Sequence, residues 1–164
     1  MTRITTVVSS IILLFILGCQ PAQQTSPTQA ESPLNDYLDF APVKIKIVSL
    51  TEFVDDSNLK IYIDLIDKFG SRVKSPAVFR FELYEYIERS AEPKGRRIFL
   101  WPDIDLTDTS ANNKYWRDFL RSYEFTMDMD FDLENGRTYI LQAFCRTSSG
   151  TRLTTEKQLT FTNR

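Results

Sequence analysis

The clearest structural signal in the chain is YEFTMDMDFDL, residues Tyr123–Leu133. Every second residue of this stretch is apolar, and a polar or acidic residue stands between each apolar pair. An α-helix would scatter these two sets around its circumference, whereas a β-strand places them on opposite faces. The stretch therefore predicts a half-buried strand with carboxylates on its wet face.

The same two-residue period recurs along the chain after residue 42. Further strands are predicted at 43–47, 59–65, 79–83, 98–101, 139–145 and 153–161. The alternation breaks in the excursion 103–121, where Thr109 or Ser110 is the candidate cap of a helical turn over residues 111–115. About seven short strands, one helical turn and no long helix predict an all-β, antiparallel sandwich.

The junction at residues 133–139 bears on the topology. Asn135-Gly136 is the strongest short signal for a two-residue hairpin turn. That hairpin would set Asp132 opposite Tyr139 and further acids beside the next apolar residues, on a face that should be buried. A chain that crosses from one sheet to the other avoids this conflict, so a crossover is predicted.

The residues after the crossover resemble a tyrosine corner. The matching residues are Leu133, Gly136, Tyr139, Leu141, Ala143 and Cys145. They are similar to this feature of fibronectin type III and related immunoglobulin-like domains, in which the tyrosine hydroxyl bonds a backbone group a few residues upstream. The family's common proline is Asn135 here, and the inter-sheet cysteine pair of antibody domains is missing. The resemblance implies an immunoglobulin-like sandwich and transfers no function.

An apolar run near the start of the chain ends at Cys19. It spans residues 7–17 and follows a single early cation, Arg3, so residues 1–18 predict a secretory signal. The sequence ILGC, Ile16–Cys19, resembles the lipobox of bacterial lipoproteins. The resemblance implies diacylglyceryl transfer to the Cys19 sulfur, cleavage before Cys19, and a further acyl chain such as palmitate on the new amino terminus.

Residue 20 and the stretch that follows bear on the predicted membrane location and on the division of the chain into segments. Gln20 stands where Asp would retain a Gram-negative lipoprotein in the inner membrane, so the resemblance favours the outer membrane. A transmembrane helix would need roughly 20 apolar residues, more than this run supplies. The predicted organisation is a signal peptide at 1–18, an acylated cysteine and flexible tether at 19–42, and a sandwich domain at 43–164. The Pro-, Gln- and Ser-rich tether would average roughly 25 Å end to end.

Composition excludes several classes of function. Loss of Arg3 with the signal leaves 19 cations against 22 acids, a net charge of −3, so no basic patch and no nucleic-acid partner are expected. Histidine is absent, which excludes His-dependent triads and most zinc sites. No phosphate loop or nucleophile elbow occurs, and no metal or other cofactor is predicted. With Cys19 acylated, Cys145 has no partner for an internal disulfide and is expected to be a small buried hydrophobe.

Aromatic residues supply two candidate binding surfaces. Trp101 and Trp116 could stack on sugar rings, although packing at the core is the commoner role of such residues. In the immunoglobulin-like arrangement, the strands at 79–83 and 139–145 pair. One outer sheet face would then carry Tyr84, Tyr86, Ile140 and Phe144. This face is too apolar to be fully wet, so we expect the 103–121 excursion to cover it, or else it is a docking surface.

Acidic residues form two groups. The first is the wet face of the opening stretch: Glu124, Asp128, Asp130, Asp132 and Glu134. Neighbours on one strand face lie about 6.6 Å apart, whereas calcium needs converging ligands, so a solvated face is predicted. Asp103, Asp105 and Asp108 lie in the excursion, where carboxylates could converge on a metal or serve a hydrolase.

These observations predict a lipoprotein held in the bacterial envelope through the lipid on Cys19. It is expected to be no enzyme and to bind a partner, a protein or a glycan, or to support an envelope assembly. One alternative is a carbohydrate-binding module that uses Trp101 or Trp116. The other is a carboxylate-dependent hydrolase built on Asp103 and its neighbours.

Overall fold

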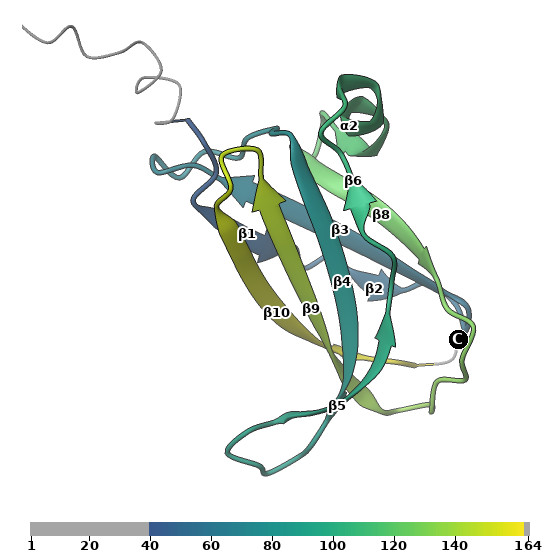
Figure 1. Ribbon diagram of the computed structural model, residues 1–164. Helices are drawn as coiled ribbons and strands as arrows, with labels where there is room; N and C mark the ends of the chain where they lie inside the picture. The colour runs from purple at the N-terminus through teal and green to yellow at the C-terminus, as the bar shows by residue number, and fades with distance from the viewer. Residues whose placement is uncertain (1–39, 163–164) are drawn as a thin grey trace, which may run out of the picture. The chain divides into compact units, whose positions relative to one another are not determined.

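The computed structural model describes residues 40–162, which form two antiparallel sheets packed face to face (Figure 1). The signal segment, Cys19 and most of the tether lie outside the described residues. The strands are β1 (Lys44–Ile47), β2 (Glu52–Phe53), β3 (Asn58–Ile66), β4 (Ala77–Tyr86), β5 (Lys94–Leu100), β6 (Ile104–Asp105), β7 (Trp116–Arg117), β8 (Ser122–Asp128), β9 (Thr138–Thr147) and β10 (Arg152–Thr160), and the helix is α2 (Thr109–Tyr115).

The strand orders are those of an immunoglobulin-like sandwich. One sheet runs β1-β3-β8-β7 with β2 beside β3, and the other runs β10-β9-β4-β5 with β6 beside β4. The prediction of an all-β, antiparallel sandwich with a short helix in the 103–121 excursion is confirmed. Among residues 40–162, no helix combines the length and the apolar character that a bilayer crossing requires.

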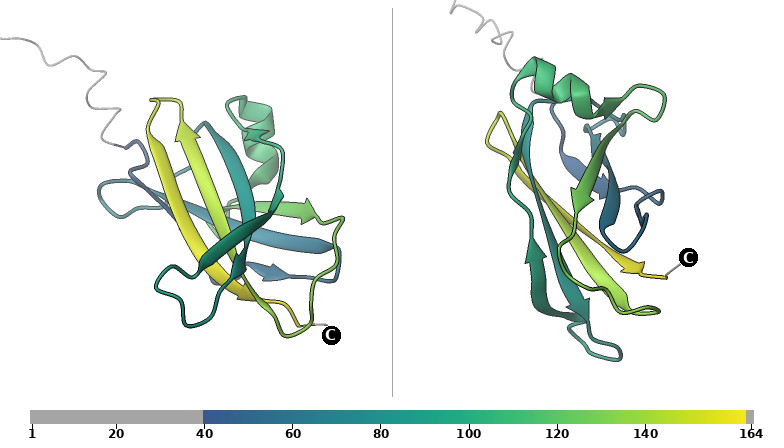
Figure 2. Two further views of the ribbon diagram at one scale, coloured as in Figure 1. Left: turned by 60° about the horizontal axis from the view of Figure 1, so that its bottom comes forward. Right: turned by 90° about the vertical axis from the view of Figure 1, so that its right-hand side faces the viewer.

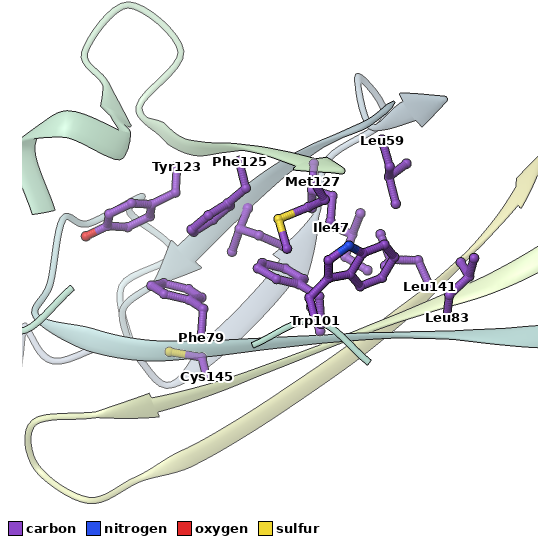
Figure 3. Close-up of a cluster of buried hydrophobic side chains, with 14 of the residues drawn as sticks. Ile47, Leu59, Phe79, Leu83, Trp101, Tyr123, Phe125, Met127, Leu141 and Cys145 are labelled. Atoms are coloured by element: carbon purple, nitrogen blue, oxygen red, sulfur yellow. The ribbon is translucent and has the colours of Figure 1, made fainter. Parts of the chain in front are cut away.

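The core lies between the two sheets and is built by the alternating residues that the sequence singles out. On β3, β4, β8 and β9 it includes Leu59, Ile61, Ile63, Leu65, Phe79, Phe81, Leu83, Tyr123, Phe125, Met127, Leu141 and Cys145. Figure 3 shows part of this core, in which Leu59, Tyr123, Phe125 and Met127 of one sheet face Phe79, Leu83, Leu141 and Cys145 of the other. The two-residue period therefore sorts inward from outward side chains correctly on each of these strands.

Strand β8 is shorter than the sequence pattern suggests. Pairing ends at Asp128, although Met129 is still buried and Phe131 packs on Phe99 with ring centroids 5.1 Å apart. The chain leaves its sheet here to reach the other one, so burial continues along the crossover while strand pairing stops. Alternation reports burial, and it cannot by itself show where the hydrogen-bond ladder ends.

The tyrosine corner is present. The hydroxyl of Tyr139 accepts a hydrogen bond from the backbone N–H of Glu134 at 3.0 Å. Gly136 has φ 78°, and its N–H donates to the carbonyl of Phe161 at 2.8 Å. Because β8 and β9 belong to different sheets, the predicted crossover is confirmed, and Asn135-Gly136 turns the chain within the crossover rather than closing a hairpin.

Two polar residues depart from the simple pattern. Asp64 falls on the outward side of β3, yet it is 1% exposed. It accepts a hydrogen bond from the Ser122 hydroxyl and forms an ion pair with Arg72 Nε at 3.0 Å, because the loop after β3 and the turn before β8 cover this end of the sheet. Helix α2 is capped by Asp108, one residue before the predicted caps, through its Oδ1 and the N–H groups of residues 110 and 111.

Candidate functional site

The outer face of the β10-β9-β4-β5 sheet carries the candidate surface. Figure 2 shows β10, β9 and β4 side by side in its left view. Their register places side chains in rows across the sheet: Val78, Arg146 and Arg152; Arg80, Phe144 and Thr154; Glu82, Gln142 and Glu156; Tyr84, Ile140 and Gln158. The four predicted surface residues Tyr84, Tyr86, Ile140 and Phe144 do belong to this face.

The half of this face around Tyr84 is closed by its own contacts. Tyr84 donates a hydrogen bond to the Glu82 carboxylate, which also accepts from Arg97 Nη1 at 3.2 Å. Lys94 Nζ lies 5.3 Å from the centroid of the Tyr84 ring and donates to Gln142 Oε1 at 3.3 Å. Burial, followed by the bond to Glu82, raises the pKa of Tyr84. These side chains contact one another and cover the sheet, so this half of the face is a layer of interacting polar side chains.

Ile140 lies within this closed half and Tyr86 at its edge. Ile140 is 2% exposed although it is on the outer face, in the row between Tyr84 and Gln158. Tyr86 is half-buried on the last position of β4, opposite Lys94. Neither residue offers an open apolar surface, so the two contribute to structure more than to docking.

The other half of the face is hollowed. The hollow has a volume of about 420 Å³ and is lined by Val78, Arg80, Asp103, Phe144, Arg146 and Arg152, among others. Phe144 is half-buried and lines the hollow together with three arginines, which come from β4, β9 and β10. We call this feature the arginine hollow.

Only one of these arginines is neutralised at close range within residues 40–162. Arg80 makes a two-pronged contact with Asp103, from Nε to Oδ1 at 2.7 Å and from Nη2 to Oδ2 at 2.9 Å. The hydrogen bond from Arg80 lowers the pKa of Asp103. Arg146 and Arg152 form no ion pair with a carboxylate of the described residues.

Arg146 and Arg152 are directly opposed on β9 and β10. Side chains at such positions have Cβ atoms about 4.5–5.5 Å apart, and like charges placed there repel. The pair therefore creates a local positive potential at the mouth of the hollow. Asp103 and Asp105, whose pKa values the charge of Arg146 helps to lower, and Glu82, which also lines the hollow, offset this potential in part. An anion placed between the two guanidinium groups would remove the repulsion and gain charge-assisted hydrogen bonds.

The two predicted tryptophans lie elsewhere. Trp101 is 4% exposed in the core, and its Nε1 donates to the carbonyl of Asp128 at 2.8 Å. Trp116 belongs to the opposite sheet through β7 and packs edge-on against Tyr123, with ring centroids 5.0 Å apart. Phe119, two residues after β7, is 83% exposed. The expectation that this part of the excursion covers the outer face is therefore wrong, because β7 pairs with β8 and carries the chain to the other sheet.

The acidic candidates are each engaged separately. Asp103 pairs with Arg80, Asp105 accepts from the Thr107 N–H at 2.9 Å, and Asp108 caps α2. The contacts with Arg80 and Thr107 lower the pKa values of Asp103 and Asp105, whereas a general acid needs a raised pKa. Within the described part of the chain, no three His, Cys, Asp or Glu side chains are grouped so that they could hold a metal ion.

Cys145 lies on the inner side of β9, beneath the hollow. Burial raises the pKa of its thiol to about 12, so the thiolate is scarce at neutral pH. This agrees with the predicted role of a small buried hydrophobe.

The arginines were missed in the sequence, although a signal for them exists. Thr147-Ser148-Ser149-Gly150 indicates a turn, and Gly150 has φ 84° in the structure. The turn itself is the three residues 148–150, between Thr147 and Thr151, and counting outward from it opposes Arg146 with Arg152. The position of Arg80 beside them depends on the pairing of β4 with β9, which sequence spacing does not give.

Similarity between this chain and known proteins was found among solved structures. No family model matches the chain, and no curated protein matches its sequence. A superoxide reductase (neelaredoxin) from Ignicoccus hospitalis is similar to 79% of this chain over 87% of its own length, with 10% identity and a TM-score of 0.43. A hypothetical protein from Pyrococcus horikoshii OT3 is similar over 74% of this chain and 91% of its own, with 18% identity and a TM-score of 0.39.

These neighbours correct one prediction. The expectation that the protein is not an enzyme is contradicted, because three of the similar structures bear the name of an enzyme. The non-enzymatic assignment is therefore dropped. TM-scores of 0.43 or less give no ground for transferring that enzyme's reaction to this chain.

Proposed function

We propose that this protein is a lipid-anchored protein of the bacterial envelope whose sandwich domain binds a small anionic ligand in the arginine hollow. The observation that supports the ligand class is the opposed pair Arg146 and Arg152, neither of which forms an ion pair with a carboxylate of residues 40–162. Guanidinium groups bind carboxylate and phosphate through two parallel N–H···O bonds, so a ligand with either group fits.

The apolar lining of the hollow adds a second requirement. Phe144, opposite Arg80 in the register of the sheet, and Val78, opposite Arg146, both line the hollow, so an apolar or ring-shaped part of the ligand would contact them. A volume of about 420 Å³ lies within the range of small-molecule sites. The proposed ligand is therefore a small molecule in which a phosphate or carboxylate adjoins an apolar or ring-shaped group.

Calorimetric titration of the full chain with three probes tests this proposal. Phenyl phosphate carries both features, inorganic phosphate carries the anion alone, and phenol carries the ring alone. We expect phenyl phosphate to bind most tightly and phenol not to bind. Arg146→Gln and Arg152→Gln should each weaken binding at least tenfold, because each removes a charge-assisted contact.

Arg96→Gln is the matched control. Arg96 belongs to β5 of the same sheet, its side chain is 78% exposed, and its partner is Glu85 rather than the hollow. It changes the net charge by the same amount, so it should leave the affinity within twofold. Equal losses in Arg96→Gln and Arg146→Gln would show a general charge effect and refute a built site.

The proposed address rests on the lipobox-like sequence Ile16–Cys19, with Gln20 favouring the outer membrane. Two or three acyl chains would anchor the protein stably, because each buried methylene contributes about 0.8 kcal/mol. Mass spectrometry of the amino-terminal peptide should show acylated Cys19. The Cys19→Ser chain should remain uncleaved at this bond, and unchanged processing of that variant would refute the lipoprotein assignment.

A further inference from the structure

Three exposed aromatic rings gather at the end of the sandwich where the chain enters the domain. Phe40 and Phe69 are 62% and 63% exposed, with ring centroids 5.7 Å apart. Phe119, 83% exposed, belongs to the turn between β7 and β8. Large apolar side chains in such positions mark a surface that meets something other than water.

Hydrogen bonds tie this turn to the loop after β3. Arg72 Nη1 donates to the carbonyl of Leu120 at 2.9 Å, and Arg121 Nη2 donates to the carbonyl of Arg72 at 2.9 Å. Figure 1 shows that α2 and the loop between β3 and β4 lie at the same end of the two sheets as the chain entry. We call residues 40–44, 67–74 and 114–121 the entry end.

The entry end is cationic in a chain that is acidic overall. Its residues include seven cations, Lys44, Lys68, Arg72, Lys74, Lys114, Arg117 and Arg121, and two acids, Asp67 and Asp118. The net charge of these segments is +5, against −2 for the whole chain. Arg72 and Arg117 pair with Asp64 and Glu124 of the neighbouring strands, and when these two acids are counted as well the formal net charge is +3.

Both acids of the entry end are occupied locally. Asp67 is 5% exposed, and its Oδ1 accepts from the N–H groups of Phe69 and Ser71 at 2.9 and 2.8 Å. Asp118 Oδ1 accepts from the indole N–H of Trp116 at 2.7 Å. These bonds shape the loops that present Phe69 and the nearby lysines outward. Lys68 Nζ lies 5.1 Å from the centroid of the Phe69 ring, so a positive charge and an exposed aromatic ring lie next to each other on this surface.

From this combination we infer that the entry end docks on an anionic lipid bilayer, with its aromatic rings at the level of the headgroups. Aromatic side chains favour the membrane interface, and lysines near it are attracted to anionic headgroups. The inference rests on the proposed lipid anchor. The tether from Cys19 joins the domain at this end, so the anchor holds these residues, rather than the opposite end, next to the bilayer. Asp36 and Asp39 precede it on the tether and would weaken the attraction without reversing its sign.

Tryptophan reporters in the acylated full chain test the inference. The chain is reconstituted in vesicles of phosphatidylethanolamine with or without phosphatidylglycerol, and quenching by brominated acyl chains is measured. The signal of the parent, from Trp101 and Trp116, is subtracted. We expect Phe69→Trp to be quenched at least twofold more with phosphatidylglycerol present, and added salt to reverse this gain.

Ile87→Trp is the matched control. Ile87 is 47% exposed on the hairpin between β4 and β5, at the opposite end of the sheets (Figure 1). Its reporter should not be quenched in either vesicle, and Lys68→Gln with Lys114→Gln should abolish the gain in quenching of Phe69→Trp that phosphatidylglycerol produces. Equal quenching of the two reporters, or quenching of Phe69→Trp that ignores phosphatidylglycerol, would overturn the inference.

Flotation of the parent chain with the vesicles separates the two proposals. A chain that does not float with the vesicles lacks the lipid anchor, and then the proposed address fails. A chain that floats while Phe69→Trp stays unquenched keeps the anchor and overturns the docking. Arg146→Gln with Arg152→Gln should leave the quenching of Phe69→Trp unchanged, since docking by the arginine hollow would make it fall.

Discussion

Tyr139→Phe should destabilise the domain by removing one hydrogen bond at the crossover. The hydroxyl of Tyr139 accepts from the Glu134 N–H at 3.0 Å, and the residue is 3% exposed. Phenylalanine keeps the ring and its edge-on contact with Phe53, whose centroid is 6.0 Å away, so packing is preserved. The cost is then that of a backbone N–H left without its partner, about 1–3 kcal/mol.

Urea unfolding followed by tryptophan fluorescence measures this cost. With a slope of about 2 kcal/mol per molar urea, the midpoint should fall by roughly 0.5–1.5 M while the slope stays constant. Tyr86→Phe is the matched control, because no hydrogen bond to its hydroxyl occurs within residues 40–162, and it should shift the midpoint by less than about 0.2 M. Equal shifts in the two variants would show that the corner hydroxyl does not fasten the crossover.

Three further predictions concern polar groups that are buried, or half-buried in the case of Lys157. Lys157→Met should cost about 1–3 kcal/mol in urea unfolding, since Lys157 Nζ donates to the carbonyls of Val48 and Ser49 at 3.0 and 3.1 Å. Asp64→Asn should cost a similar amount, about 1–3 kcal/mol, because it removes the charge that pairs with Arg72. The pKa of Cys145, raised from 9.0 to about 12, favours the folded state's neutral thiol, so stability should fall by about 1.4 kcal/mol per pH unit from pH 9 to 12. Cys145→Ala should remove that component of the pH profile.

The sequence predicts the sandwich well because the alternation of apolar and polar residues along each strand is a local pattern that can be seen without the structure. Phe79, Phe81 and Leu83 are fully buried as expected, and the conflict of acids at the Asn135-Gly136 junction correctly identifies a crossover. Alternation does not predict the burial of Asp64, because that burial depends on loops that fold over the end of the sheet. It does not predict where β8 ends either, because residues along the crossover remain buried after strand pairing has stopped.

Amino-acid composition does not predict the arginine hollow or the entry end, and the reason is different. A net charge of −2 for the whole chain predicts no basic patch, yet the loop after β3 and the segment from α2 to β8 bring cations to one end. Net charge is a sum over the whole surface, and it says nothing about how charges are distributed in space. Arg80 likewise joins Arg146 only because β4 pairs with β9.

The hollow and the entry end are neighbours, so their functions can be coupled. The turn that joins Arg146 to Arg152 also contacts the loop after β3, where the Ser148 N–H donates to the carbonyl of Pro76 at 3.3 Å. A domain docked by its entry end would therefore hold the hollow near the headgroups, where the negative surface potential of anionic lipids lowers the local concentration of an anionic ligand. Phenyl phosphate should then bind the vesicle-bound protein more weakly when phosphatidylglycerol is present. An affinity independent of phosphatidylglycerol would place the hollow beyond the reach of the lipid headgroups, with its ligand drawn from solution.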